Sequence, residues 1–247
     1  MHDEPMPQPL QGPASSTGRV APWWHTALFI LLLVGGSVVN ARQAHRIGLG
    51  SHHLERYALG IAGEAVIFLL TWWGLRLKRV PLAELLGFRR GLRALGEDFG
   101  IAMVFWVMAL AVLAVVGLTL HLVHFAGPQK AVAALAPRTG PQLLLWILLS
   151  CCAGFCEELA FRGYFFRQFS SPIHRFWLGV IGSSLIFGLS HGYEGAAGMI
   201  AITVYGALFC AVAIVRNSLR PGMIAHASQD IFSGIALALA QHFHLLH

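Results

Sequence analysis

Long apolar runs are the feature that most constrains the fold of this chain of 247 residues. A helix needs about 20 consecutive apolar residues to cross the hydrocarbon core of a bilayer, and several runs here reach or approach that length. Only 11% of the residues are charged, against about 25% in soluble domains. The composition therefore disfavours a water-soluble globule, and we expect an all-α, polytopic transmembrane helix bundle.

Seven runs are candidate membrane spans of one multi-pass unit. They cover residues 23–39, 54–75, 99–123, 141–161, 176–190, 195–215 and 223–240. Residues 1–21 are rich in Pro, Gly and Ser and lack the pattern of a cleaved signal peptide, so we expect a disordered tail there. Residues 22–140 would then form the N-terminal transmembrane helices.

The basic residues predict how the bundle is oriented. Residues 76–98, RLKRVPLAELLGFRRGLRALGED, combine basic and leucine positions as amphipathic helices on an anionic leaflet do. Most of the 17 Lys and Arg residues fall on the side that holds this segment. The positive-inside rule then places the N-terminus and this segment in the cytoplasm and the C-terminus outside, in a cell (inner) membrane. The net charge of +6 is thus assigned to cytoplasmic loops, and no nucleic-acid partner is expected.

A few ionisable residues interrupt the apolar runs. Each is costly at membrane depth, by about 2.5–3.5 kcal/mol on insertion scales, and such residues usually face the bundle interior and pair. They are Glu64, Glu157, Glu158, Arg162, His191, His226 and Asp230. Every one is therefore a candidate functional residue.

Helical phase separates the three charges of CCAGFCEELAFRGYFF, residues 151–166. Glu158 and Arg162 are four residues apart, so they share a face and can form an ion pair. Glu157 is displaced by about 100° from its neighbour and cannot use the same face. We expect a structural Glu158–Arg162 brace that leaves Glu157 free to act as a general base. The alternative is that all three charges form one buried polar staple between helices.

Two further motifs place polar residues on later spans. FGLSH stacks Phe187 over the turn that carries His191, and HASQD puts His226 and Asp230 on one helix face. Apolar packing requires none of these polar groups.

EELAFR, FGLSH and HASQD occur in this order on successive spans. The set resembles the CAAX-protease and bacteriocin-processing (CPBP or Abi) family of intramembrane proteases, to which the eukaryotic CAAX prenyl endopeptidase belongs. The resemblance covers residues 141–247 and implies a four-helix protease core that acts on a membrane-associated peptide or protein within the lipid bilayer. It implies a glutamate-dependent enzyme with no required metal or other cofactor, and it leaves the oligomeric state open.

The resemblance also implies a role for each residue of the site. Glu157 and His191 would activate a water, and His226 with Asp230 would stabilise the oxyanion. Glu158, Arg162 and Phe187 would support the site.

Asp230 departs from the asparagine that many members of the family carry. An ionised aspartate cannot donate to an oxyanion. Either Asp230 is protonated, or it accepts from His226 and orients it, and we favour the second because it needs no unusual protonation state.

The depth of His191 raises a separate question. A helix that begins at residue 176 would carry His191 towards the outer side, away from Glu157 and His226. Either that helix begins deeper, or it is broken near Gly188 or Gly192.

Four other classes of protein compete with this interpretation. Glu157, His191, His226 and Asp230 form a plausible ligand set for a metal-dependent hydrolase. Cys152 or Cys156 beside a histidine would suit a thiol enzyme, although buried cysteines commonly serve packing. A non-catalytic immunity, chaperone or scaffold protein of the same fold is the third. A transporter is the weakest alternative, because we find no inverted repeat.

Overall fold

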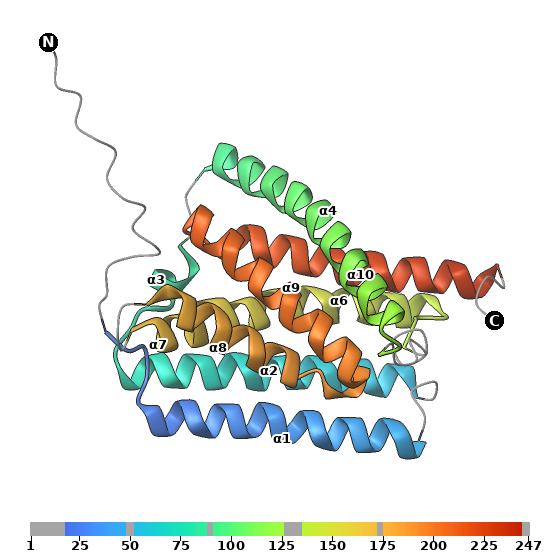
Figure 1. The fold of residues 1–247 in the computed structure, drawn as a ribbon, viewed down its shortest axis with the longest axis horizontal. Coiled ribbons are helices and arrows are strands. Elements are labelled where there is room, and N and C mark those ends of the chain that lie inside the picture. Colours follow the sequence, from blue (N-terminus) through green and yellow to red (C-terminus); the bar gives the residue numbers. More distant parts are fainter. Residues whose placement is uncertain (1–17, 48–51, 88–90, 126–134, 172–174, 244–247) are drawn as a thin grey trace, which may run out of the picture.

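The computed structural model describes residues 18–47, 52–87, 91–125, 135–171 and 175–243, and in these ranges the ordered elements are all helical. The helices are α1 (Trp23–Ile47), α2 (His53–Leu77), α3 (Leu82–Leu86), α4 (Leu92–Leu122), α6 (Gly140–Glu158), η1 (Leu159–Phe165), α7 (Phe166–Ser170), α8 (Phe176–Leu189), η3 (Gly192–Glu194), α9 (Gly195–Arg216) and α10 (Arg220–His242). The predicted all-α bundle is confirmed. The beginning of α1 and the end of α10 lie at opposite ends of it (Figure 1).

Six helical segments in the described ranges are long and apolar enough to cross a membrane. They are α1, α2, α4, the continuous segment Gly140–Ser170, the segment Gly192–Arg216 and α10. The remaining predicted span, α8, is an apolar helix of 14 residues. At 1.5 Å per residue it is about 21 Å long, short of a hydrocarbon core about 30 Å thick. Among the described residues, the bundle thus has six helices long enough to span a membrane and one shorter apolar helix.

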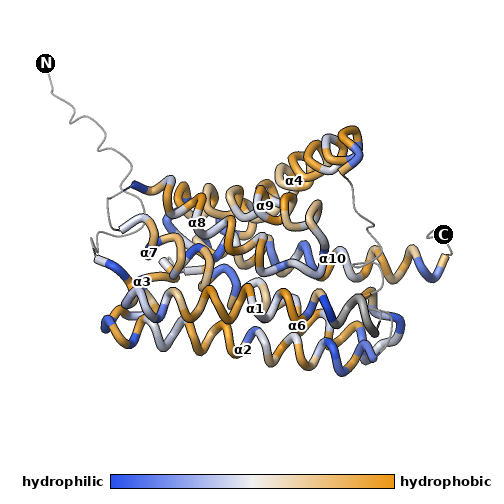
Figure 2. Tube along the Cα trace, turned by 60° about the horizontal axis from the view of Figure 1, so that its bottom comes forward, coloured by the Kyte–Doolittle hydropathy of each residue, from blue (hydrophilic) through white to orange (hydrophobic). Residues whose placement is uncertain are grey.

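The outward faces of the long helices are apolar. Val104, Val107 and Val115 of α4 and Leu144 of α6 all have more than half of their surface exposed. Hydrophobic residues dominate the middle of the helices, and hydrophilic residues gather towards their ends (Figure 2). Such a surface is stable in contact with lipid tails and not with water, so the chain is an integral membrane protein.

The helix α6 is the centre of the bundle, because it packs against α2 on one side and α10 on the other. Gly154 permits the second contact, since a Cβ built there would lie 2.8 Å from the backbone nitrogen of Ala227. At its beginning, Thr139 accepts a hydrogen bond from the backbone N–H of Gln142, and the Gln142 side chain accepts from the backbone N–H of Arg138. These bonds satisfy amides that a helix start leaves without partners. The helices α8 and α9 form a second packed pair, which α4 partly covers.

Two predicted segments differ from the structure. Residues 1–17 of the expected disordered tail lie outside the described residues, but Ala21 is buried and exchanges two backbone hydrogen bonds with the side chain of Gln168. The stretch 76–98 is not one surface helix, because it contains the end of α2, the short helix α3 and the beginning of α4. Leu85 of α3 is buried against η1. This tertiary contact holds α3 against the bundle, which is why the stretch does not form one helix on the membrane surface.

Candidate active site

A change of helix type positions the paired carboxylates and the arginine. After Glu158 the helix α6 widens into the π-helix η1, every residue of which is buried. The backbone N–H of Phe166 bonds to the carbonyl of Phe161, five residues back. Segments of π-helix are rare and often occur at functional sites. Here the wider turn holds Arg162 inside the bundle.

The ion pair expected from the four-residue spacing is present. Arg162 Nη1 lies 2.9 Å from Glu158 Oε1, and the two side chains are 1% and 0% exposed. The guanidinium carbon lies 4.3 Å from the ring centroid of Phe187 and 4.8 Å from that of Phe209, and Nη2 donates to the carbonyl of Gly206. The charge is therefore neutralised by one carboxylate and covered by two aromatic faces.

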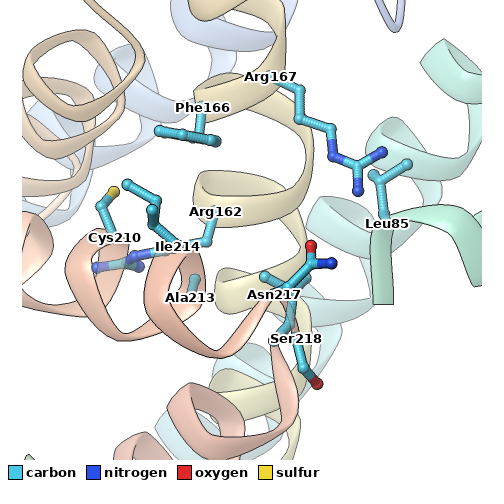
Figure 3. A pocket seen from close by; sticks show the side chains of 10 residues that line it. Leu85, Arg162, Phe166, Arg167, Cys210, Ala213, Ile214, Asn217 and Ser218 are labelled. Atoms are coloured by element: carbon cyan, nitrogen blue, oxygen red, sulfur yellow. The ribbon is translucent and has the colours of Figure 1, made fainter. Parts of the chain in front are cut away.

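A small cavity lies beside Arg162, between η1, α3 and the junction of α9 with α10 (Figure 3). Its volume is about 10 Å³, room for one water at most, so it is not a substrate site. Figure 3 shows Arg167 directed towards α3, where it forms an ion pair with Glu84 at 3.3 Å and donates to the Glu84 carbonyl.

His226 lies among three carboxylates. Its Nδ1 lies 3.2 Å from Glu158 Oε1, and its Nε2 lies 3.7 Å from both Glu157 Oε2 and Asp230 Oδ2. A carboxylate only accepts hydrogen bonds, so with Glu158 ionised Nδ1–H is the donor. A second donor at Nε2 then requires a protonated ring.

Glu157 is 9% exposed, and its Oε2 has no hydrogen-bond partner among the described residues. The predicted division between a paired Glu158 and a less constrained Glu157 thus agrees with the contacts. The backbone carbonyl of Asp230 accepts from Trp146 Nε1 at 2.8 Å, which ties this turn of α10 to α6.

The turn after α8 carries His191. The helix α8 begins at Phe176 and ends at Leu189, and η3 begins at Gly192, so α8 ends near the two glycines. His191 Nδ1 donates to the carbonyl of Phe187 at 2.8 Å. The Phe187 ring lies 4.9 Å from the His191 ring and 6.1 Å from the His226 ring. Phe187 thus contacts both imidazoles, and His191 lies close enough to Asp230 to affect it electrostatically.

The N-terminal helices also hold this turn. The backbone N–H of Gly192 donates to Ser37 Oγ of α1 at 2.7 Å, and Ser37 is buried. This contact could not be predicted from the sequence, because a serine in an apolar span commonly bonds to its own helix.

We expect Ser37→Ala to lower the thermal midpoint, because a buried N–H without a partner costs about 1–3 kcal/mol and frees the His191 turn. Thermal unfolding in detergent measures the effect. Ser150→Ala is the matched control, since among the described residues the Ser150 hydroxyl bonds within its own helix, to the carbonyl of Trp146. Equal midpoints of both variants would show that the α1 contact does not hold the His191 turn.

Three residues that were not predicted as site residues also lie at the site. Glu64 of α2 is within hydrogen-bonding reach of Glu157. Tyr193 and Glu194 of η3 are close enough to feel the charge of Glu157. Glu64 could be recognised as an ionisable residue at membrane depth, but its partner depends on how α2 packs.

The metal-dependent and thiol-enzyme alternatives can be compared with this arrangement of side chains. Within the described ranges, no group of three or more His, Cys, Asp and Glu side chains is placed to hold a metal ion. The charged or ionisable neighbours of Cys156 are Glu64, Glu157 and Cys152. An activated thiol needs an imidazole or a positive charge beside it, so this environment does not favour a cysteine nucleophile.

Comparison with known proteins agrees with the motifs. Residues 139–232 match the family model described as type II CAAX prenyl endopeptidase Rce1-like. The match runs from the cap of α6 into α10 and contains every predicted site residue. No curated protein and no solved structure matches the chain. The family match confirms the resemblance that the three motifs indicate and, with the membrane-spanning helices, supports a protease-like function in the membrane.

Proposed function

Since residues 139–232 match the Rce1-like CAAX prenyl endopeptidase family model, we propose that this membrane protein is an intramembrane endopeptidase that uses a glutamate-activated water. The observation that carries the proposal is that three carboxylates lie within 3.7 Å of the ring nitrogens of His226. They belong to Glu157, Asp230 and Glu158, and Glu158 is also paired with Arg162. A bundle that needs only packing has no use for three carboxylates around one imidazole, because each is costly to bury.

In the proposed reaction, Glu157 takes a proton from a water as the water oxygen attacks the scissile carbonyl. His191 orients the same water, since donation from Nδ1 to the Phe187 carbonyl leaves Nε2 of a neutral ring as an acceptor. The protonated Glu157 then returns the proton to the leaving amine. The products are a new carboxyl terminus and a new amino terminus, and no oxidant or reductant is needed.

His226 stabilises the oxyanion in this mechanism. Because Nδ1 donates to Glu158, Nε2 donates to the oxyanion only when the ring is protonated. Asp230 supplies negative charge beside Nε2 and orients the ring. Glu158 therefore acts both as the partner of Arg162 and as the acceptor that sets the proton position of His226.

The site faces the cytoplasmic side in this proposal. His226 lies within two turns of the beginning of α10. The same end of the bundle carries the ion pairs of Arg216 and Arg220 with Asp98 and the pair of Arg167 with Glu84. Basic residues at this end support a cytoplasmic location, with the N-terminus in the cytoplasm. The substrate is a membrane-associated peptide or protein whose scissile bond reaches this level of the bilayer.

A comparison of membrane proteomes tests the proposed function. Cells that carry the wild-type protein are compared with cells that carry Glu157→Ala at equal expression, and new amino and carboxyl termini are identified. We expect termini that appear only with the wild type. If both forms give the same termini and the same cellular phenotype, the protein acts by binding, as an immunity or scaffold protein would.

Asp230→Asn separates the two roles considered for this aspartate. If Asp230 supports a protonated His226 through its charge, we expect kcat to fall about tenfold or more, with KM and expression unchanged. Cleavage kinetics on a substrate from the proteome comparison measure this. Equal or higher activity of the asparagine form would show that position 230 needs only an amide or its equivalent.

A further inference from the structure

Glu64 lies outside the segment that matches the protease family and is close to Glu157, the base of the proposed reaction. It belongs to the membrane-spanning helix α2, is 8% exposed, and its Oε2 has no hydrogen-bond partner among the described residues. A carboxyl group buried at this depth without a partner is costly. The groups that Glu64 contacts therefore determine whether its burial is tolerated.

The packing of α2 on α6 determines the level of Glu64 in the bundle. One turn before it, a Cβ built at Gly60 would lie 3.1 Å from the side chain of Leu149. One turn after it, the Phe68 ring lies 6.1 Å from the Phe155 ring. The two helices thus run in the same direction, and Glu64 lies on the face of α2 that contacts α6.

Between these contacts, Glu64 lies opposite the turn of α6 that precedes Glu157. Side chains on a helix lean towards its N-terminus, so the Glu157 carboxyl group reaches back to this level. The two side chains are within hydrogen-bonding reach of each other. The charges of His226 and Asp230 also act on Glu64.

A hydrogen bond between two carboxyl groups requires a proton on one of them. The arginine of the site, Arg162, is already paired with Glu158, so the Glu64–Glu157 contact is not bridged by that cation. A protonated Glu64 would satisfy its own buried group and donate to Glu157, and Glu157 would keep the charge that a base needs.

We propose that Glu64 is a positioning residue that donates a hydrogen bond to Glu157 and aims its carboxylate at the substrate water. The inference rests on the proposed function, because it gives Glu157 the role of base. It also assigns part of the site to the N-terminal helices, which the family match does not include.

Three variants at two positions test this role. In Glu64→Leu the donor is lost at similar volume, and we expect kcat to fall about 10- to 100-fold with little change in KM. Glu64→Gln keeps an N–H donor and is expected to recover a large part of that loss. Glu84→Gln, at a glutamate that pairs with Arg167, is the control. Equal activity of the leucine and glutamine forms would overturn the inference.

A second measurement does not depend on activity. The thermal midpoints of Glu64→Leu, Glu157→Leu and the double variant in detergent form a double-mutant cycle, in which each change removes one carboxyl group of the contact. We expect the two changes to be non-additive, while Glu64→Leu and Glu84→Gln add. Additive midpoints at 64 and 157 would overturn the contact. Non-additive midpoints in a protein that cleaves nothing would contradict the proposed function and leave the contact standing.

Discussion

Glu157→Gln is expected to abolish peptide-bond cleavage while the protein remains folded in the membrane. The substitution keeps the size of the side chain but removes its ability to take a proton from water. General bases contribute about 10²- to 10⁴-fold to rate, so we expect kcat/KM to fall by about 10³-fold. The thermal midpoint should stay close to that of the wild type, because Glu157 Oε2 has no hydrogen-bond partner among the described residues.

The activity of Glu157→Gln is compared with that of a control variant that carries the same Glu→Gln change at another position. Glu84→Gln is this control, because Glu84 is partly exposed and pairs with Arg167 at the end of the bundle. Purified enzyme and a peptide that spans a mapped cleavage site give the two rates. Cleavage by Glu157→Gln within tenfold of the wild type would remove Glu157 as the base. A rate that chelators abolish and added metal restores would favour the metal-dependent alternative instead.

Part of the fold and of the candidate site could be predicted from helical phase and apolar patterning. The apolar runs predicted the bundle, and the spacing of Glu158 and Arg162 predicted their ion pair, because both depend on residues close in sequence. The motif order predicted that Glu157, His226 and Asp230 belong to one site. Their separations in sequence carry no geometric information, so the 3.7 Å contacts required the folded chain.

Other features depend on tertiary structure that local patterns do not encode. The π-helix η1 departs from the ideal period on which the sequence analysis relied. Glu158 also bonds to His226, 68 residues away, so it is more than a partner for Arg162. The contacts of Ser37 and Glu64 with the site depend on how α1 and α2 pack. An ionisable residue at membrane depth marks a functional position without naming its partner.

Arg162→Met is expected to have the largest effect on stability. It leaves Glu158, which is 0% exposed, as a buried charge without its cation. Breaking such a pair from one side costs about 3–5 kcal/mol, against a total stability of about 5–15 kcal/mol for a typical domain. We therefore expect a sharp fall in folded yield and in the thermal midpoint measured in detergent.

The variant Arg162→Lys distinguishes charge from shape. Lysine keeps the positive charge but has no planar group to lie between Phe187 and Phe209, so we expect an intermediate midpoint.

The double variant Arg162→Met, Glu158→Gln separates the structural role of the pair from its chemical role. Without either charge, the desolvation penalty disappears, and much of the lost stability should return. Activity should not return, because His226 Nδ1 then faces an amide in place of the carboxylate that it contacts at 3.2 Å. Recovery of both stability and activity would show that Glu158 only neutralises Arg162. Recovery of stability alone would show that the pair also holds the imidazole in the protonation pattern that oxyanion stabilisation requires.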